Sequence, residues 1–390
     1  MQLDFHYYAT YCTAYLAGYS HEESLSICQS AQFVDRCTAT LLTKLKAPRA
    51  AATTQLPLEM MENSSDRVGR ENITRIWSSF HFLPYDLYAA KKRCGKRYLD
   101  KYRLICQPNS DLVVETVKLA KGGSLQAVGV AMHVLADTWA HRNFAGTPSL
   151  VINNTNYHFY ELLTDGETVT KRKIKFIHSA VAKDDFENGV YVNSLYQASE
   201  NAVMNIGHGR AGHLPDYSFA RYQYLPAWAD YEEITKDNPK EYYLAFCQMV
   251  YALKYLRGDA PTFEKETYDF KTVAPWESQI KAVLQKRQGK EEACADWKAM
   301  GEKISGTAIG DFDMEDYQAE YLNAADSGKD DTYIGKFIQA AIAHKSMVTN
   351  MIFKSGNKLA GFPKDYERPA ALLRRARKKE AAERKGGGEA

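Results

Sequence analysis

Apolar residues recur at helical spacing along most of the chain. An amphipathic run over residues 7–16 ends at Gly18, and the next helix begins after Ser20, which has capping-box spacing to Glu23. Later helical runs cover residues 242–256, 275–288, 293–303 and 334–345. The pattern therefore predicts a mainly α-helical protein.

The pattern changes between residues 149 and 177. Segments rich in β-forming residues flank Asp165 and Gly166, a pair that is typical of the tight turn in a β-hairpin. We expect a small hairpin inserted into the helical protein, with ordinary structural roles for its two histidines, His158 and His178.

The segments on either side of the hairpin carry two further predictions. Pro48, Pro57 and a polar run interrupt the helical periodicity between residues 47 and 70, so a long loop is expected there, as a lid over a site or as a disordered excursion. After the hairpin, helices are expected to resume at Tyr191, with a helical run over residues 192–205.

These patterns, with a boundary at residues 258–261, divide the chain into segments. They are a helical core over residues 1–148 and 181–260, the hairpin insertion over residues 149–180, a helical C-terminal region over residues 261–367 and a basic tail over residues 368–390. The C-terminal region lacks obvious metal ligands. It therefore completes the core, caps a site or contacts a partner.

The most informative stretch for function is residues 132–141, in which His133, Asp137 and His141 follow one another at intervals of four residues. The surrounding residues are apolar almost all round, as in a buried helix, and Ser124 is expected to cap its start. A carboxylate and two imidazoles inside such a helix are costly unless they are paired or bound to metal. Either a structural Asp-His pair or a metal site meets this requirement.

The helical geometry favours more than one ion. Each step of four residues rises about 6 Å, so His133 and His141 lie roughly 12 Å apart along the helix axis and do not reach one ion together. Asp137 lies between them and has two oxygens, which suits a bridge between ions about 3.5–4 Å apart.

Other candidate ligands lie before or after this helix. They share imidazole or carboxylate side chains: Asp4 and His6 at the start of the first helix, Asp35 beside the apolar stripe of the second, His81 in an aromatic segment, and His208, His213 and Asp216 in a glycine-rich bend. Glycines let the backbone pass close to a compact metal centre, and they serve ordinary tight turns equally well. The combination of these residues with the His133 helix favours a metal site.

The order of these residues resembles the superfamily of zinc-dependent phospholipases C and single-strand-specific zinc nucleases. The shared pattern is an N-terminal His, an Asp about thirty residues later, a His in an aromatic loop, and then H-x-x-x-D followed by further ligands. The opening D-F-H-Y-Y-A-T-Y and the run D-T-W-A-H also resemble an uncharacterised bacterial branch of that superfamily. The resemblance covers roughly residues 1–220.

The resemblance implies a multi-helix core like that of phospholipase C and the zinc nucleases, around three zinc ions that bind phosphate and activate water. The ligand sets that it implies are Asp35, His81, His133 and Asp137 for one ion, His6 with Asp137 for another, and His141 and His208 with His213 or Asp216 for the third.

The chain departs from the superfamily at two points. Secreted members begin at a tryptophan whose amino group and carbonyl bind zinc, whereas this chain has Met1 with no preceding signal peptide, and one hypothesis is that Asp4 substitutes as an anionic ligand. The third ion of the family usually has a His followed one helical turn later by an acid, and the bend does not keep that spacing. A site with two metals therefore stays open beside a site with three.

Composition sets further bounds. Of the 390 residues 45% are hydrophobic and 25% charged, so the chain is globular rather than disordered. The formal net charge of +2 gives no whole-chain argument for a polyanionic partner. No run of about 18 apolar residues occurs, so we expect a cytoplasmic protein that does not span a membrane. The 7 cysteines lack C-x-x-C spacing, which indicates reduced thiols.

The tail is strongly basic. Residues 368–385 contain eight Lys or Arg side chains against two glutamates. The segment is expected to be a solvated or frayed helix, or to make a weak contact with an anionic surface.

The sequence thus predicts a zinc-dependent hydrolase of a phosphoric ester, with a phospholipid or a nucleotide or nucleic acid as the substrate. Asp35 and Asp4 are the candidates for orienting or deprotonating the attacking water. Imidazole and carboxylate ligands suit zinc best, and they also suit iron, manganese or nickel. The alternative is a non-enzymatic protein in which a metal site stabilises the fold and the C-terminal region mediates an interaction.

Overall fold

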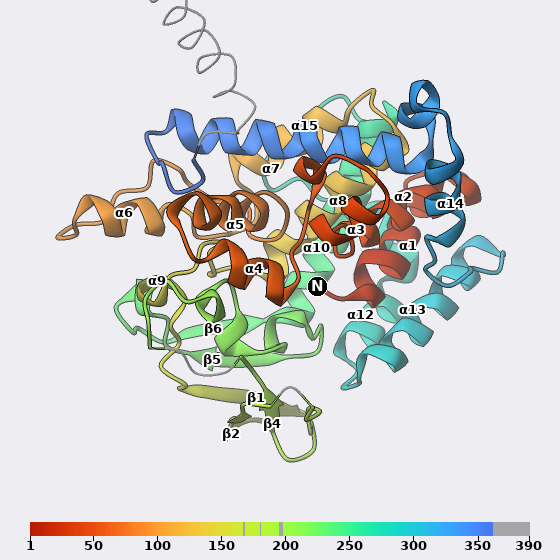
Figure 1. The fold of residues 1–390 in the computed structure, drawn as a ribbon. Helices are drawn as coiled ribbons and strands as arrows, with labels where there is room; N and C mark the ends of the chain where they lie inside the picture. Colours follow the sequence, from red (N-terminus) through yellow and green to blue (C-terminus); the bar gives the residue numbers. More distant parts are fainter. Residues whose placement is uncertain (167, 180, 195–197, 362–390) are drawn as a thin grey trace, which may run out of the picture.

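The computed structural model describes residues 1–166, 168–179, 181–194 and 198–361. Helix α8 (Leu125–Ala140) runs through the middle of the helical part and is buried along almost its whole length. The helices that pack most closely around it are α2 (His21–Phe33), α7 (Asp111–Ala120), α10 (Asn238–Arg257) and α15 (Tyr333–Lys354) (Figure 1). Because α8 meets other helices on every side, its sequence is apolar almost all round. The prediction of a mainly α-helical protein is confirmed.

Side-chain caps begin α2 and α8 where the sequence predicts. The Ser20 hydroxyl accepts a hydrogen bond from the main-chain N–H of Glu23 at 3.2 Å, and the Glu23 carboxylate accepts one from the Ser20 N–H at 2.8 Å. Ser124 caps α8 by accepting from the N–H of Ala127. A cap of this kind stabilises a helix by about 1 kcal/mol. The two caps set the first residue of α8, which carries His133 and Asp137, and of α2, which leads to Asp35.

The chain begins with a buried π-helix, η1 (Asp4–Ala9), that continues into α1 (Thr10–Leu16). Helix α13 (Lys290–Ser305) packs against η1, and the ring of Phe5 meets the indole of Trp297 edge to face at 5.9 Å. The described residues of the C-terminal region share one hydrophobic core with α1, α2 and α8. The C-terminal region therefore completes the core, which is one of the roles expected of it.

The remaining helices cover this core or lead to the sheet. Their bounds are α3 (Ala39–Lys44), α4 (Pro57–Asn63), α5 (Arg67–Phe80), α6 (Lys96–Tyr102), α9 (Leu150–Asn153), α11 (Phe270–Val273), α12 (Glu277–Gln285) and α14 (Glu315–Asn323). Short 3-10 helices are η2 (Arg49–Ala51), η3 (Val203–Asn205), η6 (Ala227–Ala229), η7 (Ala274–Trp276) and η8 (Asp326–Asp331).

Helix α4 corrects the prediction of one long loop over residues 47–70. Pro57 stands in the first turn of α4, where a proline ring fits because the first N–H groups of a helix have no partner within it. The side chain of Glu59 then accepts from the N–H of Leu56 at 3.0 Å. The proline that interrupts the periodicity in the sequence therefore begins a helix.

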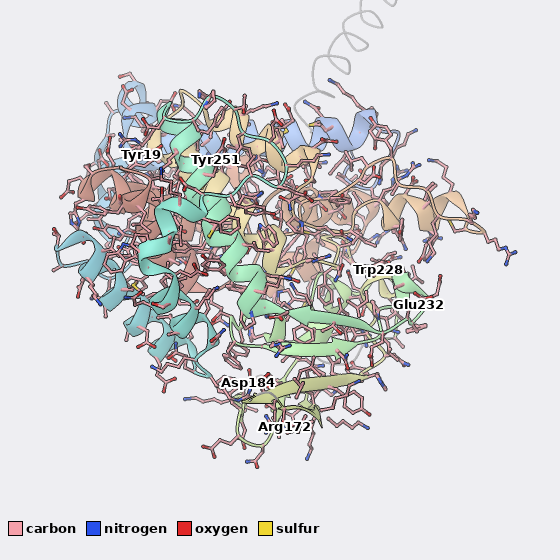
Figure 2. The ribbon with its side chains drawn as sticks, turned by 180° about the vertical axis from the view of Figure 1, so that it is seen from behind. Tyr19, Arg172, Asp184, Trp228, Glu232 and Tyr251 are labelled. Atoms are coloured by element: carbon pink, nitrogen blue, oxygen red, sulfur yellow. The ribbon has the colours of Figure 1, made fainter. Side chains whose placement is uncertain are left out.

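A four-stranded antiparallel sheet lies beside the helices, with the strand order β2-β1-β5-β6. The strands are β1 (Phe159–Asp165), β2 (Thr168–Lys173), β5 (Arg221–Tyr224) and β6 (Ile234–Asp237). The predicted hairpin is confirmed, because β1 and β2 pair from Tyr160 opposite Lys173 to Asp165 opposite Thr168. Seen from behind, Arg172 and Asp184 mark the sheet end of the molecule, and Tyr19 and Tyr251 mark the opposite, helical end (Figure 2).

Two predictions around the hairpin are wrong. Residues 150–153 form helix α9 rather than a β arm. Tyr191 does not begin a helix but lies in strand β4 (Val190–Val192), which pairs in parallel with β3 (Lys175–Ile177). Its ring is buried while the flanking valines are half-buried, so the segment has the alternation of a strand. Of the expected helical run over residues 192–205, only η3 is helical among the described residues.

The sheet closes over a second core, which is mostly aromatic. The ring of Tyr224 stacks on Phe144 at 5.8 Å and on Phe159 at 5.3 Å. Phe82 belongs to the same core and stacks on His141 at 4.7 Å. This core also buries Leu214, so it holds the glycine-rich bend against the end of α8.

Three further features bear on the sequence predictions. No helix in the described ranges is both long enough and apolar enough to cross a membrane. The 7 cysteines are all free thiols. The basic tail over residues 368–390 lies outside the described residues.

Gly129 tests the close packing of α8 against α2. A Cβ atom at this position would lie 2.4 Å from the main-chain oxygen of Ile27 and 2.5 Å from the Cβ of Ser30, both on α2. Gly129→Ala should therefore push the helices apart and lower the free energy of unfolding by about 1–3 kcal/mol, despite the better helix propensity of alanine. Urea denaturation followed by circular dichroism measures the change.

Gly328→Ala is the matched control. Gly328 lies in the helical turn η8, and a Cβ atom added there meets nothing within 4 Å. Equal stabilities of the Gly129 and Gly328 variants would contradict the close approach of α2 and α8.

Candidate metal centre

The candidate ligands gather around two carboxylates, Asp137 and Asp216. Oδ1 of Asp137 lies 3.0 Å from Nε2 of His6, and its Oδ2 lies 3.1 Å from Nδ1 of His81 and 3.1 Å from Nε2 of His133. Nε2 of His141 lies 3.2 Å from Oδ1 of Asp216. The structure thus brings together residues from η1, the end of α5, α8 and the glycine-rich bend.

Main-chain carbonyls orient four of the imidazole rings. One nitrogen of each ring lies at hydrogen-bonding distance from a carbonyl oxygen: His81 Nε2 from Thr53 at 3.1 Å, His133 Nδ1 from Ala31 at 2.9 Å, His141 Nδ1 from His81 at 2.7 Å, and His208 Nδ1 from Gly212 at 2.8 Å. A carbonyl only accepts, so these nitrogens carry the proton and donate it. In a neutral ring the other nitrogen then presents its lone pair to the carboxylates.

A ring-nitrogen lone pair and a carboxylate oxygen that face each other repel, unless a cation lies between them. Nε2 of His133 is 3.1 Å from Oδ2 of Asp137 and 3.3 Å from Nδ1 of His81, so three acceptors meet at close range. Burial opposes protonation of the rings, because it lowers the pKa of His6 and of His208 to about 4 and also lowers the pKa of His81. This arrangement of donors and charges favours a bound cation.

The surroundings of His6 show most directly whether the cluster fits a metal ion. Both of its ring nitrogens are buried without a hydrogen-bond partner in the described part of the chain. Nε2 approaches Oδ1 of Asp137 at 3.0 Å, but the pair lacks hydrogen-bond geometry. Since buried polar groups are otherwise nearly always paired, an imidazole in this state fits a metal ligand.

Three groups of ligand atoms each lie within 4.8 Å of one another. They are His6, His133 and Asp137; Asp35, His81 and His133; and His141, His208 and Asp216. His133 belongs to two groups, but one imidazole nitrogen binds one ion. Two neighbouring ions would therefore share the oxygens of Asp137, which contacts His6, His81 and His133.

The centre opens to solvent beside Asp35. The side chain of Asp35 is 30% exposed, whereas those of His133 and Asp137 are 0% and 1% exposed. Oδ1 of Asp35 lies 3.9 Å from Nδ1 of His81, and its Oδ2 accepts from the side-chain amide of Gln32 at 3.2 Å. Asp35 is thus half-buried and faces the imidazole pair.

The amino group of residue 1 also lies inside the centre. The nitrogen of Met1 is 2.8 Å from Oδ1 of Asp137, 3.2 Å from Oδ1 of Asp216 and 3.1 Å from Nε2 of His141. Burial alone would lower the pKa of this amino group, but the two carboxylates outweigh burial and raise the pKa to about 11. Sequence reasoning missed this group because a main-chain amine has no side-chain pattern. Its signal was the terminal amino group that binds zinc in secreted members of the superfamily that the sequence resembles, for which Asp4 is the proposed substitute.

Asp4 does not take the position proposed for it as a substitute ligand. Its side chain is buried, and burial raises its pKa to about 6. It belongs to none of the three groups found among the described residues. The amino group of Met1, and not the Asp4 carboxylate, contacts both Asp137 and Asp216.

Two 3-10 turns bring His208 and Asp216 together in spite of their irregular spacing. These are η4 (Gly209–Ala211) and η5 (Leu214–Asp216), with Gly212 between them at a φ of +57°. A Cβ atom on Gly212 would lie 2.1 Å from the main-chain oxygen of Val192, so only glycine fits this reversal. Nε2 of His208 comes within 3.7 Å of Oδ1 of Asp216.

His213 lies at the edge of this group rather than in it. Its side chain is 59% exposed, and its Nδ1 lies 2.9 Å from Oδ2 of Asp216. The hydrogen bond to Asp216 raises the pKa of His213. Of the two residues considered for the third ion, Asp216 faces His141 and His208, and His213 orients Asp216 from outside.

The fold and the site define a mainly α-helical protein with a buried His/Asp cluster of the composition found in metal centres. Residues 1–352 match a family of unknown function (DUF6765), and the chain belongs to that family. No curated protein and no solved structure matches the chain. The three ligand groups lie within the matched residues.

Asp137 is expected to control the metal content of the protein. Its carboxylate contacts imidazoles of two ligand groups, so Asp137→Asn removes a charge that neighbouring ions would share. Protein purified without chelators should contain about two or three divalent ions per chain, and the variant should contain at most one. Plasma mass spectrometry of the two proteins measures the difference.

Asp66→Asn serves as the control for this experiment. Asp66 caps α5 through the N–H of Gly69, and asparagine keeps such a cap. An unchanged ion content in Asp137→Asn, or wild-type protein without metal, would contradict the assignment.

Proposed function

We propose that this protein is a zinc-dependent hydrolase of phosphoric esters. The observation that carries the proposal is the contact of one carboxylate, Asp137, with imidazoles from η1, α5 and α8 beside a second group around Asp216. A carboxylate shared by neighbouring ions is suited to phosphoryl chemistry, because paired cations stabilise the attacking and leaving oxygens together. A single structural zinc needs four ligands and no bridge.

Zinc is the ion that the donor set supports best. The three groups offer imidazole nitrogens and carboxylate oxygens, and no cysteine belongs to any of them among the described residues. The resemblance to the zinc-dependent phospholipases C and single-strand nucleases points to the same ion. The group of His141, His208 and Asp216 matches one ligand set that the resemblance implies, and the other two groups draw on the remaining implied ligands and share His133, so we also propose the corresponding multi-helix core.

The residues of the chain would divide the chemical work. Bound zinc would supply neutralisation of phosphate charge and a water of lowered pKa. Asp35 is the best candidate to orient that water, because it is partly exposed and lies 3.9 Å from His81 and 4.0 Å from His133. The carbonyls of Thr53 and Ala31 would keep both imidazoles aligned.

Exposed apolar side chains favour a lipid over a nucleotide as the substrate. Leu56, Leu58 and Met61 are 44%, 72% and 55% exposed, before and within α4. They follow the segment that supplies the Thr53 carbonyl to His81. Apolar side chains exposed together in this way fit contact with acyl chains.

Zinc-loaded protein should hydrolyse bis(4-nitrophenyl) phosphate and the phospholipid of phosphatidylcholine vesicles. Asp35→Asn should lower kcat by about 100-fold and leave the fold intact, because the lost carboxylate is partly exposed and orients the water. Release of nitrophenolate and of phosphorylated headgroup are the readouts, with single-stranded DNA as a parallel substrate.

Asp326→Asn is the control, since that side chain is 97% exposed on η8. Fully metallated protein that turns over none of the three substrates would contradict the proposal.

Deep burial supports a second candidate function, in which the metal stabilises the fold of a non-enzymatic protein. The side chains of His6, His133 and Asp137 are at most 1% exposed. In that case chelation should unfold the protein, Asp35→Asn should lower the melting temperature because a ligand of the group is lost, and the metal-loaded protein should hydrolyse none of the three substrates. Differential scanning calorimetry with and without chelator, on the same samples as the hydrolysis assay, separates the two functions.

A further inference from the structure

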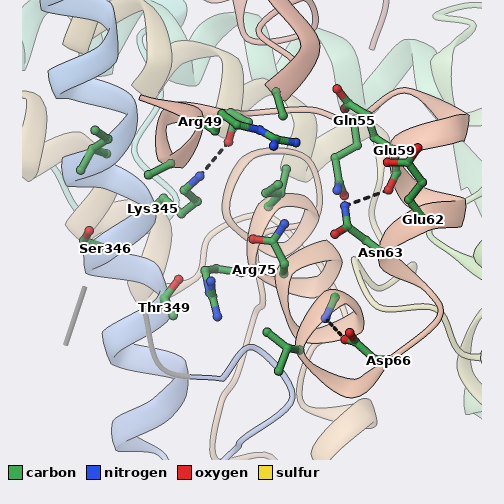
Figure 3. Close-up of a pocket in the computed structure, with 18 residues that line it drawn as sticks. Arg49, Gln55, Glu59, Glu62, Asn63, Asp66, Arg75, Lys345, Ser346 and Thr349 are labelled. Atoms are coloured by element: carbon green, nitrogen blue, oxygen red, sulfur yellow. Dashed lines mark hydrogen bonds between the residues drawn. The ribbon is translucent and has the colours of Figure 1, made fainter. Parts of the chain in front are cut away.

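A large cavity is lined in part by Ala52 and Gln55, on either side of Thr53, whose carbonyl contacts His81. It has a volume of about 540 Å³ and is enclosed by η2, α4, α5 and α15 (Figure 3). Sites for small molecules commonly have volumes of roughly 300–1,000 Å³. No residue of the three ligand groups lines this cavity, so it is separate from the candidate metal centre.

The inner wall of the cavity carries buried hydrogen-bond donors. Arg75 and Lys345 are each 8% exposed, and Thr349 is fully buried. Figure 3 shows Lys345 and Thr349 on α15, with Arg75 beside them. The Thr349 hydroxyl has no hydrogen-bond partner among the described residues. Because a buried hydroxyl without a partner is unfavourable, this atom points to a ligand that would pair with it.

Main-chain carbonyls orient the two buried cations. Nζ of Lys345 donates to the carbonyl of Ala52 at 2.8 Å, and Nε of Arg75 donates to the carbonyl of Ala360 at 3.1 Å. A third cation, Arg49, is exposed at the rim. Cations at a buried wall act on an anion through a lower effective dielectric than that of water.

The acids that line the cavity are either engaged or exposed. The buried carboxylate of Glu59 accepts from the N–H and the hydroxyl of Thr40 at 2.7 and 2.6 Å and from the N–H of Leu56 at 3.0 Å. Asp66 and Glu62 are exposed, and Asp66 also caps α5. The cavity thus has buried cations and a hydroxyl on one wall and its available acids at the rim.

We propose that this cavity binds a small polar molecule that carries an oxyanion, either a phosphate or a carboxylate. The oxyanion accepts from the Thr349 hydroxyl and lies between Arg75 and Lys345, where charge-assisted hydrogen bonds are strongest. The polar body of the ligand reaches the side-chain amides of Asn63 and Asn72, which line the same cavity. The site goes beyond the proposed function, because binding here requires no metal ion.

One short segment separates the cavity from the metal centre. The carbonyl of Ala52 accepts from Lys345, and the carbonyl of the next residue, Thr53, accepts from Nε2 of His81. Ala52 and Gln55 line the cavity. A ligand bound at Lys345 therefore contacts the partner of Ala52, and Ala52 directly precedes Thr53, whose carbonyl orients His81.

Isothermal titration calorimetry of the full chain tests the proposal, with inorganic phosphate, pyrophosphate and citrate as probes at constant ionic strength. At least one probe should bind saturably, and the comparison of citrate with the phosphates shows which oxyanion is preferred. Thr349→Val removes the hydroxyl and keeps the shape, so it should weaken binding by about 10-fold. Lys345→Met should weaken binding further through loss of the charge.

Thr116→Val is the matched control. Thr116 is also buried with an unpaired hydroxyl among the described residues, but it lies on α7, away from this cavity. Its variant should bind the probe as wild type does, and binding should persist after metal is removed by chelation. Absence of saturable binding of all three probes would overturn the proposal.

A second outcome would also overturn it. A phosphate signal that is unaffected by Thr349→Val and disappears on chelation would belong to the metal centre. The proposed hydrolase and this cavity can therefore fail independently of each other.

Discussion

The centre depends on hydrogen bonds from histidine rings to main-chain carbonyls. Each carbonyl accepts a hydrogen bond from one ring N–H, which leaves the other ring nitrogen facing Asp137 or Asp216. The carbonyls come from α2, from the segment after η2, from the end of α5 and from the glycine-rich bend. These segments must therefore all be in place before the lone pairs converge. A positive charge stabilises the buried acceptors that meet at Asp137, and the amino group of Met1 supplies one beside Oδ1.

The two parts of the molecule support the two carboxylates separately. The helical core fixes α8 and presses α13 onto η1, which places His6 against Asp137. The aromatic core under the sheet holds Leu214 and stacks Phe82 on His141, which fixes the Asp216 side. The amino group of Met1 contacts both carboxylates. The sheet therefore belongs to the construction of the site and is more than an insertion on the surface.

The sequence predicts those features that leave a local signal. The caps at Ser20 and Ser124, the β1–β2 hairpin and the helix of the H-x-x-x-D run each need only nearby residues, and the structure contains all of them. The strand at Tyr191 depends on a pairing partner fifteen residues earlier, and the start of α4 depends on Pro57 lying in a first turn rather than in a loop. The choice of Asp216 over His213 depends on the reversal at Gly212. Such features arise from contacts between distant residues, which periodicity and spacing do not report.

The most direct test of the central claim is anomalous diffraction from crystals of the protein, with data collected on both sides of the zinc absorption edge. The account predicts anomalous peaks beside Asp35, His81 and His133 and beside His141, His208 and Asp216, with Asp137 in contact with more than one ion. Absence of any peak at this cluster, with the histidine rings hydrogen-bonded directly to the carboxylates, would contradict it.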